Sequence, residues 1–179
     1  MDAGKIAGLA GTFGLAMVLG AVFFQYVIGV APCEVCYWQR YPHATAAAVG
    51  IVGFLLGAFG LLDRRKMTAV AVLTLVALAV AGVLGIYHSG VEWKFWAGPS
   101  ACTGDRYVFT GVIDLNAPSV VRCDVVSWRF LGIFSLANLN AIFSLSVAAL
   151  GGVLLRYPQL YDWAYEKVCT ALGKGKARS

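Results

Sequence analysis

The sequence predicts an all-α integral membrane protein, a bundle of four transmembrane helices with both termini in the cytoplasm. The chain has 179 residues, of which 60% are hydrophobic and only 13% are charged, and its mean hydropathy is +0.76. Average soluble domains carry about 25% charged residues, so a soluble fold of this length could not bury so much apolar surface. Apolar runs of about 20 residues, the length that spans a bilayer, lie at about 6–30, 43–62, 67–87 and 132–155. We therefore expect one membrane domain over residues 1–179.

Basic residues predict the orientation of these helices. Nine of the 14 Lys and Arg residues fall on one side of a four-span topology and five on the other. The side with nine carries Lys5, Arg64, Arg65, Lys66, Arg156, Lys167, Lys174, Lys176 and Arg178. Because basic residues accumulate on the cytoplasmic side, the loops at 31–42 and 88–131 are predicted to lie on the opposite side and the tail at 156–179 in the cytoplasm. The net charge of +5 is therefore a topology signal, and we expect the lipid bilayer, not nucleic acid, as the partner of this surface.

Each apolar run has features that predict its role. The first is too long for a signal-peptide core and is followed by no clear cleavage site, so we expect an uncleaved anchor. Small residues recur four apart in the first three runs, a spacing that lets helix backbones approach closely. The loop at 88–131 is rich in turn signals, and we expect it to be irregular with one short surface helix. The tail from Tyr157 predicts an amphipathic interfacial helix, with residues 174–179 disordered.

The start of the second helix has two solutions in the sequence. Pro42 suits the first turn of a helix that begins beside it. Inside a helix, the same proline would remove a hydrogen bond and kink the chain. A helix that begins near Cys33 places Cys36 and Arg40 on one face, at positions i and i+4. We favour the earlier start with a kink at Pro42.

The main chemical signal is the Cys-x-x-Cys pair formed by Cys33 and Cys36, with Arg40 four residues later. A helix start beside the pair and the charge of Arg40 would both favour a thiolate. A static disulfide or two inert cysteines would have the same spacing. A haem attachment site requires His directly after the second cysteine, but Tyr37 stands there. A structural zinc site requires four ligands, commonly in closely spaced pairs. We expect a redox-active dithiol and no metal.

Cys102 and Cys123 form a second pair in the long loop. One interpretation is a structural disulfide that closes a 20-residue loop, which would stabilise the fold by about 3 kcal/mol. The other is an exchangeable pair that a partner's thiol can reach, because disulfides pass between proteins by thiolate attack. Two exchangeable pairs on one face would form an electron relay. Cys169, in the tail, is expected to be inert.

His43 and His88 are the only histidines. Each could donate a hydrogen bond to a quinone oxygen, but a histidine at the membrane interface is more often simply solvated. Asn138 and Asn140, early in the fourth run, predict hydrogen bonds between helices and imply no chemistry.

Taken together, these residues resemble the disulfide bond formation protein B (DsbB) family. The resemblance rests on Pro32-Cys33-Glu34-Val35-Cys36 with the aromatic pair Tyr37-Trp38 and Arg40, on Cys102 and Cys123, and on the segment from Trp128 to Asn140. It implies a four-helix enzyme of the bacterial inner membrane, with its redox loops facing the periplasm. Such an enzyme reoxidises a periplasmic DsbA-like thioredoxin-fold protein and passes electrons to a quinone of the membrane pool, ubiquinone or menaquinone.

The resemblance also implies a role for each site residue. Cys33 and Cys36 would be the quinone-linked pair, with Cys36 nearest the quinone and Arg40 stabilising its thiolate. Cys102 would form the mixed disulfide with the partner, Cys123 would be its companion, and His88 would lie beside the quinone. Two positions depart from the pattern: Gln39 stands where some members have an acidic residue, and Pro42 alters the start of the second helix.

Two other functions are compatible with the sequence. A membrane scaffold would use both cysteine pairs as permanent structural disulfides. A quinone or epoxide reductase of similar helical bundle would take electrons from protein thiols, although such enzymes usually carry the quinone-side Cys-x-x-Cys in a late helix, and here it follows the first.

Overall fold

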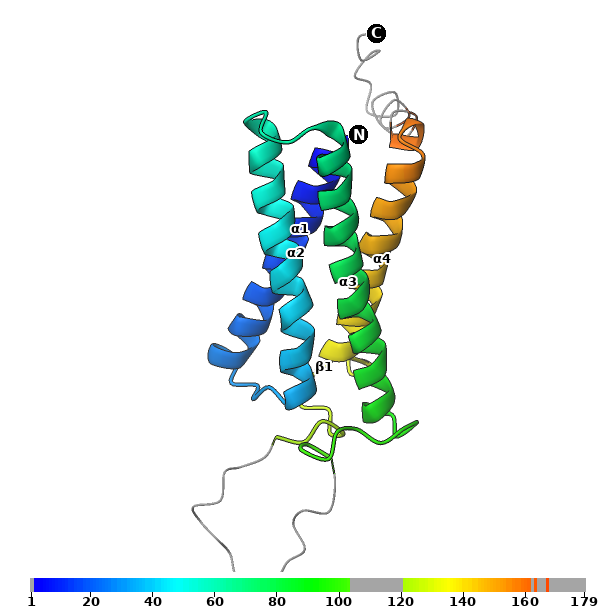
Figure 1. Ribbon diagram of the computed structural model, residues 1–179. Helices are drawn as coiled ribbons and strands as arrows, with labels where there is room; N and C mark the ends of the chain where they lie inside the picture. The colour runs from blue at the N-terminus through cyan, green and yellow to red at the C-terminus, as the bar shows by residue number, and fades with distance from the viewer. Residues whose placement is uncertain (1, 104–120, 162, 164–166, 168–179) are drawn as a thin grey trace, which may run out of the picture.

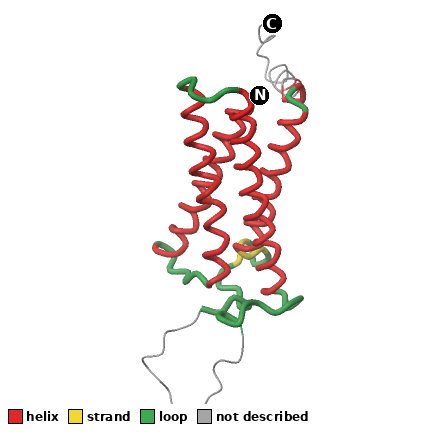
Figure 2. Tube along the Cα trace, viewed as in Figure 1, coloured by secondary structure: helices red, strands yellow, loops and turns green. Residues whose placement is uncertain are grey.

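The computed structural model describes residues 2–103, 121–161, 163 and 167 and is a bundle of four helices (Figures 1 and 2). In chain order the elements are α1 (Ala3–Tyr26), α2 (Glu34–Ala58), α3 (Arg64–Glu92), the two-residue strands β1 (Arg129–Phe130) and β2 (Phe134–Ser135), and α4 (Leu136–Arg156). All four helices are long and apolar enough to cross a membrane. The predicted fold class, an all-α bundle of four membrane-spanning helices, is confirmed.

A side chain caps the first turn of each helix. Asp2, Asp63 and Ser135 each accept a hydrogen bond from the backbone N–H three residues later. Ser135 and Asn138 form a reciprocal capping box, which satisfies two of the N–H groups that a helix start leaves without partners. The cap of α2 is a cysteine, because the sulfur of Cys33 accepts the backbone N–H of Cys36. The helix starts are therefore encoded locally.

The start of α2 corrects the predicted span at 43–62. The helix begins at Glu34 and contains Pro42 in its interior, so most of the predicted loop at 31–42 is helical. Cys33 caps the first turn, and Pro42 is the ninth residue of the helix. The hydrogen bond that this proline lacks therefore falls inside α2 and does not mark its start. Of the two starts that the sequence allows, the earlier one is correct.

The other boundaries also shift. α1 covers 3–26, not 6–30. α3 extends over 64–92, beyond the predicted 67–87 at both ends, because Arg64, Arg65 and Lys66 form its first helical turn and the helix continues to Glu92. α4 starts at Leu136 and not at 132, since β1 and β2 pair antiparallel just before it. Leu131 and Gly132 make this turn with positive φ angles of 51° and 72°, and Ser135 can cap α4 only after it.

Close backbone contacts between helices hold the bundle together at two glycines. At Gly50 in α2, an added Cβ would lie 2.5 Å from the carbonyl oxygen of Ala7 and 2.8 Å from the Cα of Gly11 in α1. At Gly85 in α3, it would lie 2.8 Å from the backbone nitrogen of Ala141 in α4. The buried core between these helices consists mostly of alanine and leucine. Small residues thus allow the helices to approach as predicted.

The start of α1 and the end of α4 lie at the same end of the bundle (Figure 1). That this end faces the cytoplasm stays a prediction from the charges. Residues 104–120 of the long loop lie outside the described residues, so the short surface helix stays a prediction. Most of the predicted tail helix, the terminal stretch 174–179 and Cys169 also lie outside them.

Candidate active site

Both cysteine pairs lie at the end of the bundle opposite to the start of α1 (Figure 1). Cys33 directly precedes α2, whereas Cys102 and Cys123 lie in the connection between α3 and α4. These three cysteines are buried in one cluster with Val35 and Val91, separate from the core between the helices. The fold thus places next to each other two cysteine pairs that are far apart in the sequence.

Cys33 and Cys36 are free thiols whose Sγ atoms lie 2.8 Å apart. The backbone N–H of Cys36 donates to the sulfur of Cys33 at 3.3 Å. The hydrogen bond to Cys36 and burial both raise the pKa of the Cys33 thiol. Cys36 lies in the first turn of α2, where free backbone N–H groups carry partial positive charge. The two sulfurs therefore occupy unequal environments.

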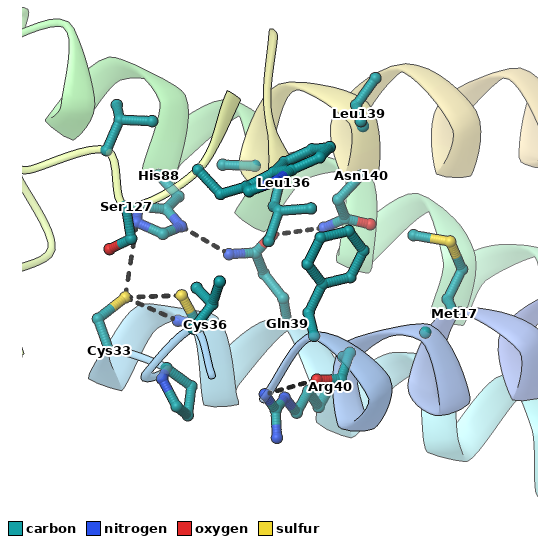
Figure 3. Close-up of a pocket in the computed structure, with 18 of the residues that line it drawn as sticks. Met17, Cys33, Cys36, Gln39, Arg40, His88, Ser127, Leu136, Leu139 and Asn140 are labelled. Carbon is teal, nitrogen blue, oxygen red and sulfur yellow. Dashed lines mark hydrogen bonds between the residues drawn. The ribbon is translucent and has the colours of Figure 1, made fainter. Parts of the chain in front are cut away.

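A cavity of about 290 Å³ lies beside this pair (Figure 3). Cys33, Cys36, Arg40 and His88 contribute polar atoms to its wall. The remaining wall is largely apolar and includes Met17 and Phe24 of α1 and Leu136, Leu139 and Phe143 of α4. A mostly apolar cavity with a few convergent polar groups is typical of sites that bind small apolar molecules.

Arg40 lines the cavity one helical turn after Cys36, as the earlier helix start requires. Its guanidinium group donates to the side-chain oxygen of Gln25 at 2.7 Å and lies 4.7 Å from the centre of the Tyr37 ring. These contacts hold the cation at the wall of the cavity, from where its charge acts on the sulfur of Cys36. Arg40 is thus positioned by α1 as well as by its own helix.

Both histidines are buried, which corrects their interpretation as solvated interfacial residues. The Nε2 atom of His88 lies 3.6 Å from the sulfur of Cys33. Nδ1 of His88 lies 2.9 Å from the side-chain nitrogen of Gln39. His43 lies deeper, with Nε2 2.8 Å from the side-chain oxygen of Asn140. Only His88 therefore contacts a cysteine among the described residues.

Asn138 and Asn140 bond across helices, as predicted. Asn138 donates to Ser89 of α3 at 2.7 Å. Asn140 donates to Gln39 of α2 at 2.5 Å and to the backbone oxygen of Ala81 of α3 at 3.0 Å. Gln39 was singled out only as a departure from a family pattern, yet it links the asparagine to His88. Hydrogen bonds between side chains of α2, α3 and α4 therefore hold these helices together at the end of the bundle that contains the cysteines.

Glu92 is a site residue that sequence reasoning missed. Its side chain is only 6% exposed and lines the cavity. Ser135 donates a hydrogen bond to it at 2.5 Å, and its Oε1 atom lies 4.0 Å from Nε2 of His88. A buried carboxylate at the end of a helix is unfavourable without such partners. Its spacing of four residues from His88, on the same helical face, was the available signal.

The two sulfurs and one imidazole nitrogen are close enough to contact the same ion. The Sγ atoms of Cys33 and Cys36 and one ring nitrogen of His88 lie within 4.8 Å of one another. Thiolates and a neutral imidazole nitrogen are the ligands that Zn²⁺ prefers. Whether this group could bind an ion depends on which nitrogen of His88 carries the proton.

Cys102 and Cys123 form a disulfide bond. Next to it, Asp124 accepts hydrogen bonds from Arg122 and pairs with Lys94, which lies two residues after the end of α3. The hydrogen bonds from Arg122, and then the contact with Lys94, hold the pKa of Asp124 well below its usual range. These contacts fasten the segment that carries Cys123 to the end of α3.

Replacing Asp124 by Asn should accelerate chemical reduction of the Cys102–Cys123 disulfide about two- to fivefold, because two ion pairs of modest strength are lost. A depressed pKa stabilises the fold above the unfolded value of about 3.9 and loses this effect as pH falls through the folded pKa. The rate difference should thus be constant from pH 5 to 8 and shrink below about pH 4. Reduction by a phosphine, followed by alkylation, measures it. Asp63→Asn, at the opposite end, is the control, and equal rates for wild type and Asp124→Asn would contradict the prediction.

Comparison with known proteins agrees with the arrangement of cysteines and helices. The family model "Disulfide bond formation protein DsbB" matches residues 4–154. The chain is 30% identical over 161 residues to disulfide bond formation protein B of Acidovorax sp. (strain JS42), covering 84% of this chain and 86% of that protein. It is also 30% identical over 146 residues to the protein of the same name from Marinobacter nauticus, covering 80% of this chain and 86% of that protein. No solved structure matches the chain.

The family match spans the described helices and includes all four cysteines of the candidate site. Together with the four membrane-spanning helices, it identifies a multi-pass bacterial membrane protein with a redox role in disulfide bond formation. The chain belongs to the DsbB family of disulfide bond formation proteins.

Proposed function

We propose that this protein is a quinone-dependent protein-disulfide oxidase of the bacterial inner membrane. It reoxidises a periplasmic DsbA-like thioredoxin-fold protein and passes the electrons through its two cysteine pairs to the membrane quinone pool. The observation that carries this proposal is the single buried cluster that holds Cys33, Cys102 and Cys123, beside a largely apolar cavity. A permanent scaffold would not need a free dithiol at the wall of such a cavity.

In the proposed sequence, a thiolate of the partner attacks the Cys102–Cys123 disulfide and forms a mixed disulfide with Cys102. The partner's second thiolate then releases it, so that the partner is oxidised and the pair gains two electrons and two protons. A second exchange passes these to the Cys33–Cys36 disulfide by the same thiolate chemistry. A quinone, when bound, accepts the two electrons and two protons as the Cys33–Cys36 disulfide forms again.

The residues around the cavity fit a quinone. Its wall is largely apolar, as the ring and tail of a quinone require, and Arg40 supplies a cation near Cys36. His43 also lines the cavity, and its buried Nδ1 atom has no hydrogen-bond partner in the described part of the chain. We assign quinone binding to Arg40, His88 and Cys36. No residue is assigned to a resident metal.

The energetics favour a strong terminal acceptor. A DsbA-like oxidant has a reduction potential of about −120 mV, about 150 mV above thioredoxin. Since about 30 mV corresponds to 1.4 kcal/mol for two electrons, oxidising its dithiol is about 7 kcal/mol harder than oxidising that of thioredoxin. An oxidised quinone is suited to this task, and the lipid bilayer can supply it.

The direct test is turnover by the purified protein. We expect it to oxidise a reduced thioredoxin-fold partner in the presence of ubiquinone or menaquinone, with one quinone reduced for each disulfide formed. Omitting the quinone is the control. Alkylation of thiols in membranes gives a second measurement: both pairs should become free thiols when the quinone pool is reduced. Pairs that stay oxidised under this condition would contradict the proposal and support the scaffold.

A further inference from the structure

Two buried amide side chains connect the interior of the bundle to the cysteine pair (Figure 3). Asn140 donates from its Nδ2 atom to the backbone oxygen of Ala81 and to the side-chain oxygen of Gln39. With its oxygen so occupied, Gln39 directs its nitrogen to Nδ1 of His88 at 2.9 Å and to the backbone oxygen of Val35 at 3.2 Å. These hydrogen bonds determine, for both amides, which side-chain atom is the nitrogen and which is the oxygen.

The other side of Asn140 is also bonded in this orientation. Its side-chain oxygen accepts a hydrogen bond from the hydroxyl of Ser144 at 2.8 Å and lies 2.8 Å from Nε2 of His43. The backbone oxygen of Ala81 fixes the orientation, because rotating the amide of Asn140 by 180° would place its oxygen against this acceptor. Asn140 and Gln39 are only 5% and 7% exposed, so water cannot replace the lost partners without cost.

The groups on the two sides of the His88 ring favour the same tautomer. Nδ1 faces the amide N–H of Gln39 and must therefore act as an acceptor. Nε2 faces the sulfur of Cys33 and the carboxylate of Glu92 at 4.0 Å. These groups can accept a hydrogen bond from an N–H at Nε2. A neutral imidazole carries one N–H, and here both sides of the ring place it on Nε2.

We propose that Gln39 and Asn140 are positioning residues that hold His88 in the Nε2–H tautomer and so orient the hydrogen bonds toward the cysteine pair. The bonds run from Asn140 to Gln39, from Gln39 to His88, and from His88 to the sulfur of Cys33. Cys33, receiving a hydrogen bond from His88, donates its own S–H to Cys36. The chain of donors therefore ends on Cys36, which carries the negative charge of the reduced pair.

The role of this tautomer in the reaction rests on the proposed function. When the disulfide forms again, the sulfur–sulfur bond forms between Cys33 and Cys36. The Cys33 proton would go to the reduced quinone, and the second proton of the quinol would come from water, because Cys36 is already ionised. Two electrons leave the pair for the quinone. Because Cys33 retains its proton until that step, the charge stays on Cys36, beside Arg40 and the cavity. The raised pKa of Cys33 is consistent with this division of roles.

The decisive variant is Gln39→Glu, which replaces the N–H donor by an acceptor oxygen of the same size. A carboxylate at this position would accept a proton from Nδ1, so the proton of His88 should move from Nε2 to Nδ1. Nε2, now without its own proton, would act as a base and take the proton of Cys33, while Cys36 would take a proton from water. The thiolate should then form on Cys33 instead of Cys36. The same change would expose a lone pair at Nε2 to the two sulfurs.

Nitrogen NMR of the reduced, quinone-free protein labelled at histidine measures the tautomer directly. The chain has two histidines, and a His43→Gln variant assigns their signals. We expect His88 to carry its proton on Nε2 in the wild type and on Nδ1, or on both nitrogens, in Gln39→Glu. Asn138→Asp, an amide-to-acid change in the other buried network of α4, should leave both histidines unchanged. A wild-type His88 protonated on Nδ1 would overturn the proposal without any variant.

Two further measurements on the same quinone-free protein separate positioning from a merely structural role. The ratio of Cys33 to Cys36 alkylation by limiting iodoacetamide at pH 7 should rise about tenfold or more in Gln39→Glu, because the thiolate is the reactive form. Affinity of the reduced protein for Cd²⁺ alone should rise about 10- to 100-fold, the usual effect of a residue that orients a histidine ligand. An unchanged ratio and an unchanged affinity would overturn the proposal. Neither measurement uses a quinone or a partner, so failure of the proposed function would not affect them.

Discussion

In the Cys33→Ser variant, turnover with quinone should fall to the uncatalysed background, and added quinone should produce a new visible absorption band. Without the sulfur of Cys33, which lies 2.8 Å from that of Cys36, the disulfide cannot form again. Cys36 is then left as a lone thiolate at the wall of the cavity. A thiolate beside an electron-poor ring absorbs visible light by charge transfer. A spectrophotometric titration with quinone measures the band, and full activity of Cys33→Ser would refute the relay.

Adding Arg40→Met to Cys33→Ser should remove this band. Arg40 lines the same cavity, and its charge acts on the sulfur of Cys36, so its loss should return Cys36 to a protonated thiol. Arg156→Met is the matched control, because Arg156 makes a similar contact with the adjacent Tyr157 ring, at 5.6 Å, in the opposite half of the bundle. A band that survives Arg40→Met would show that another group stabilises the thiolate.

The largest effect on folding should come from Gly50. Gly50→Ala should lower the free energy of unfolding by about 1–3 kcal/mol, and Gly50→Leu should prevent assembly of the bundle. The added Cβ would lie 2.5 Å from the backbone oxygen of Ala7 and 2.8 Å from the Cα of Gly11. Because both are backbone atoms, no side chain can rotate away, and α1 itself must move. Unfolding in detergent, followed by circular dichroism, measures the effect.

Gly152 in α4 provides the control for this substitution. An added Cβ there has no atom within 4 Å, and alanine is favoured over glycine in a helix interior by about 1 kcal/mol. Gly152→Ala should therefore leave stability unchanged or raise it slightly. The same chemical change is thus expected to have opposite signs in two helices. Equal effects at the two positions would show that α1 and α2 do not pack at Gly50.

The parts of the fold that depend on local sequence were predictable. Apolar runs of about 20 residues identify membrane helices, and the four helices are present. Their ends were less accessible, because they depend on which residue caps the first turn. For α2 the sequence allowed two starts, and the spacing of Cys36 and Arg40 favoured the correct one near Cys33, although cysteine is an uncommon cap. The pairing of β1 with β2, which delays α4 to Leu136, involves only two residues on each strand and carries no periodic signal.

The site was predictable where spacing along one helix defines it. Cys36 and Arg40, four residues apart in α2, both line the cavity as expected. The burial of His88 and its contact with Gln39 were not predictable, because they arise where α2, α3 and α4 meet. Glu92 was missed for the same reason, since its partner Ser135 lies 43 residues away in the chain. Contacts between elements require knowledge of how the helices pack.

The position of the cavity between α1 and α4 also determines how a ligand arrives. Phe143 lines the cavity and is 50% exposed, and it belongs to α4, which is long and apolar enough to cross a membrane. The cavity wall therefore includes an exposed apolar side chain of a membrane-spanning helix. A hydrophobic substrate would thus diffuse laterally in the plane of the bilayer and enter sideways, without crossing water. The turnover rate should saturate with the mole fraction of this substrate in the lipid rather than with its concentration in the whole sample. Diluting the membranes with extra phospholipid would then slow turnover even though no reactant has been removed.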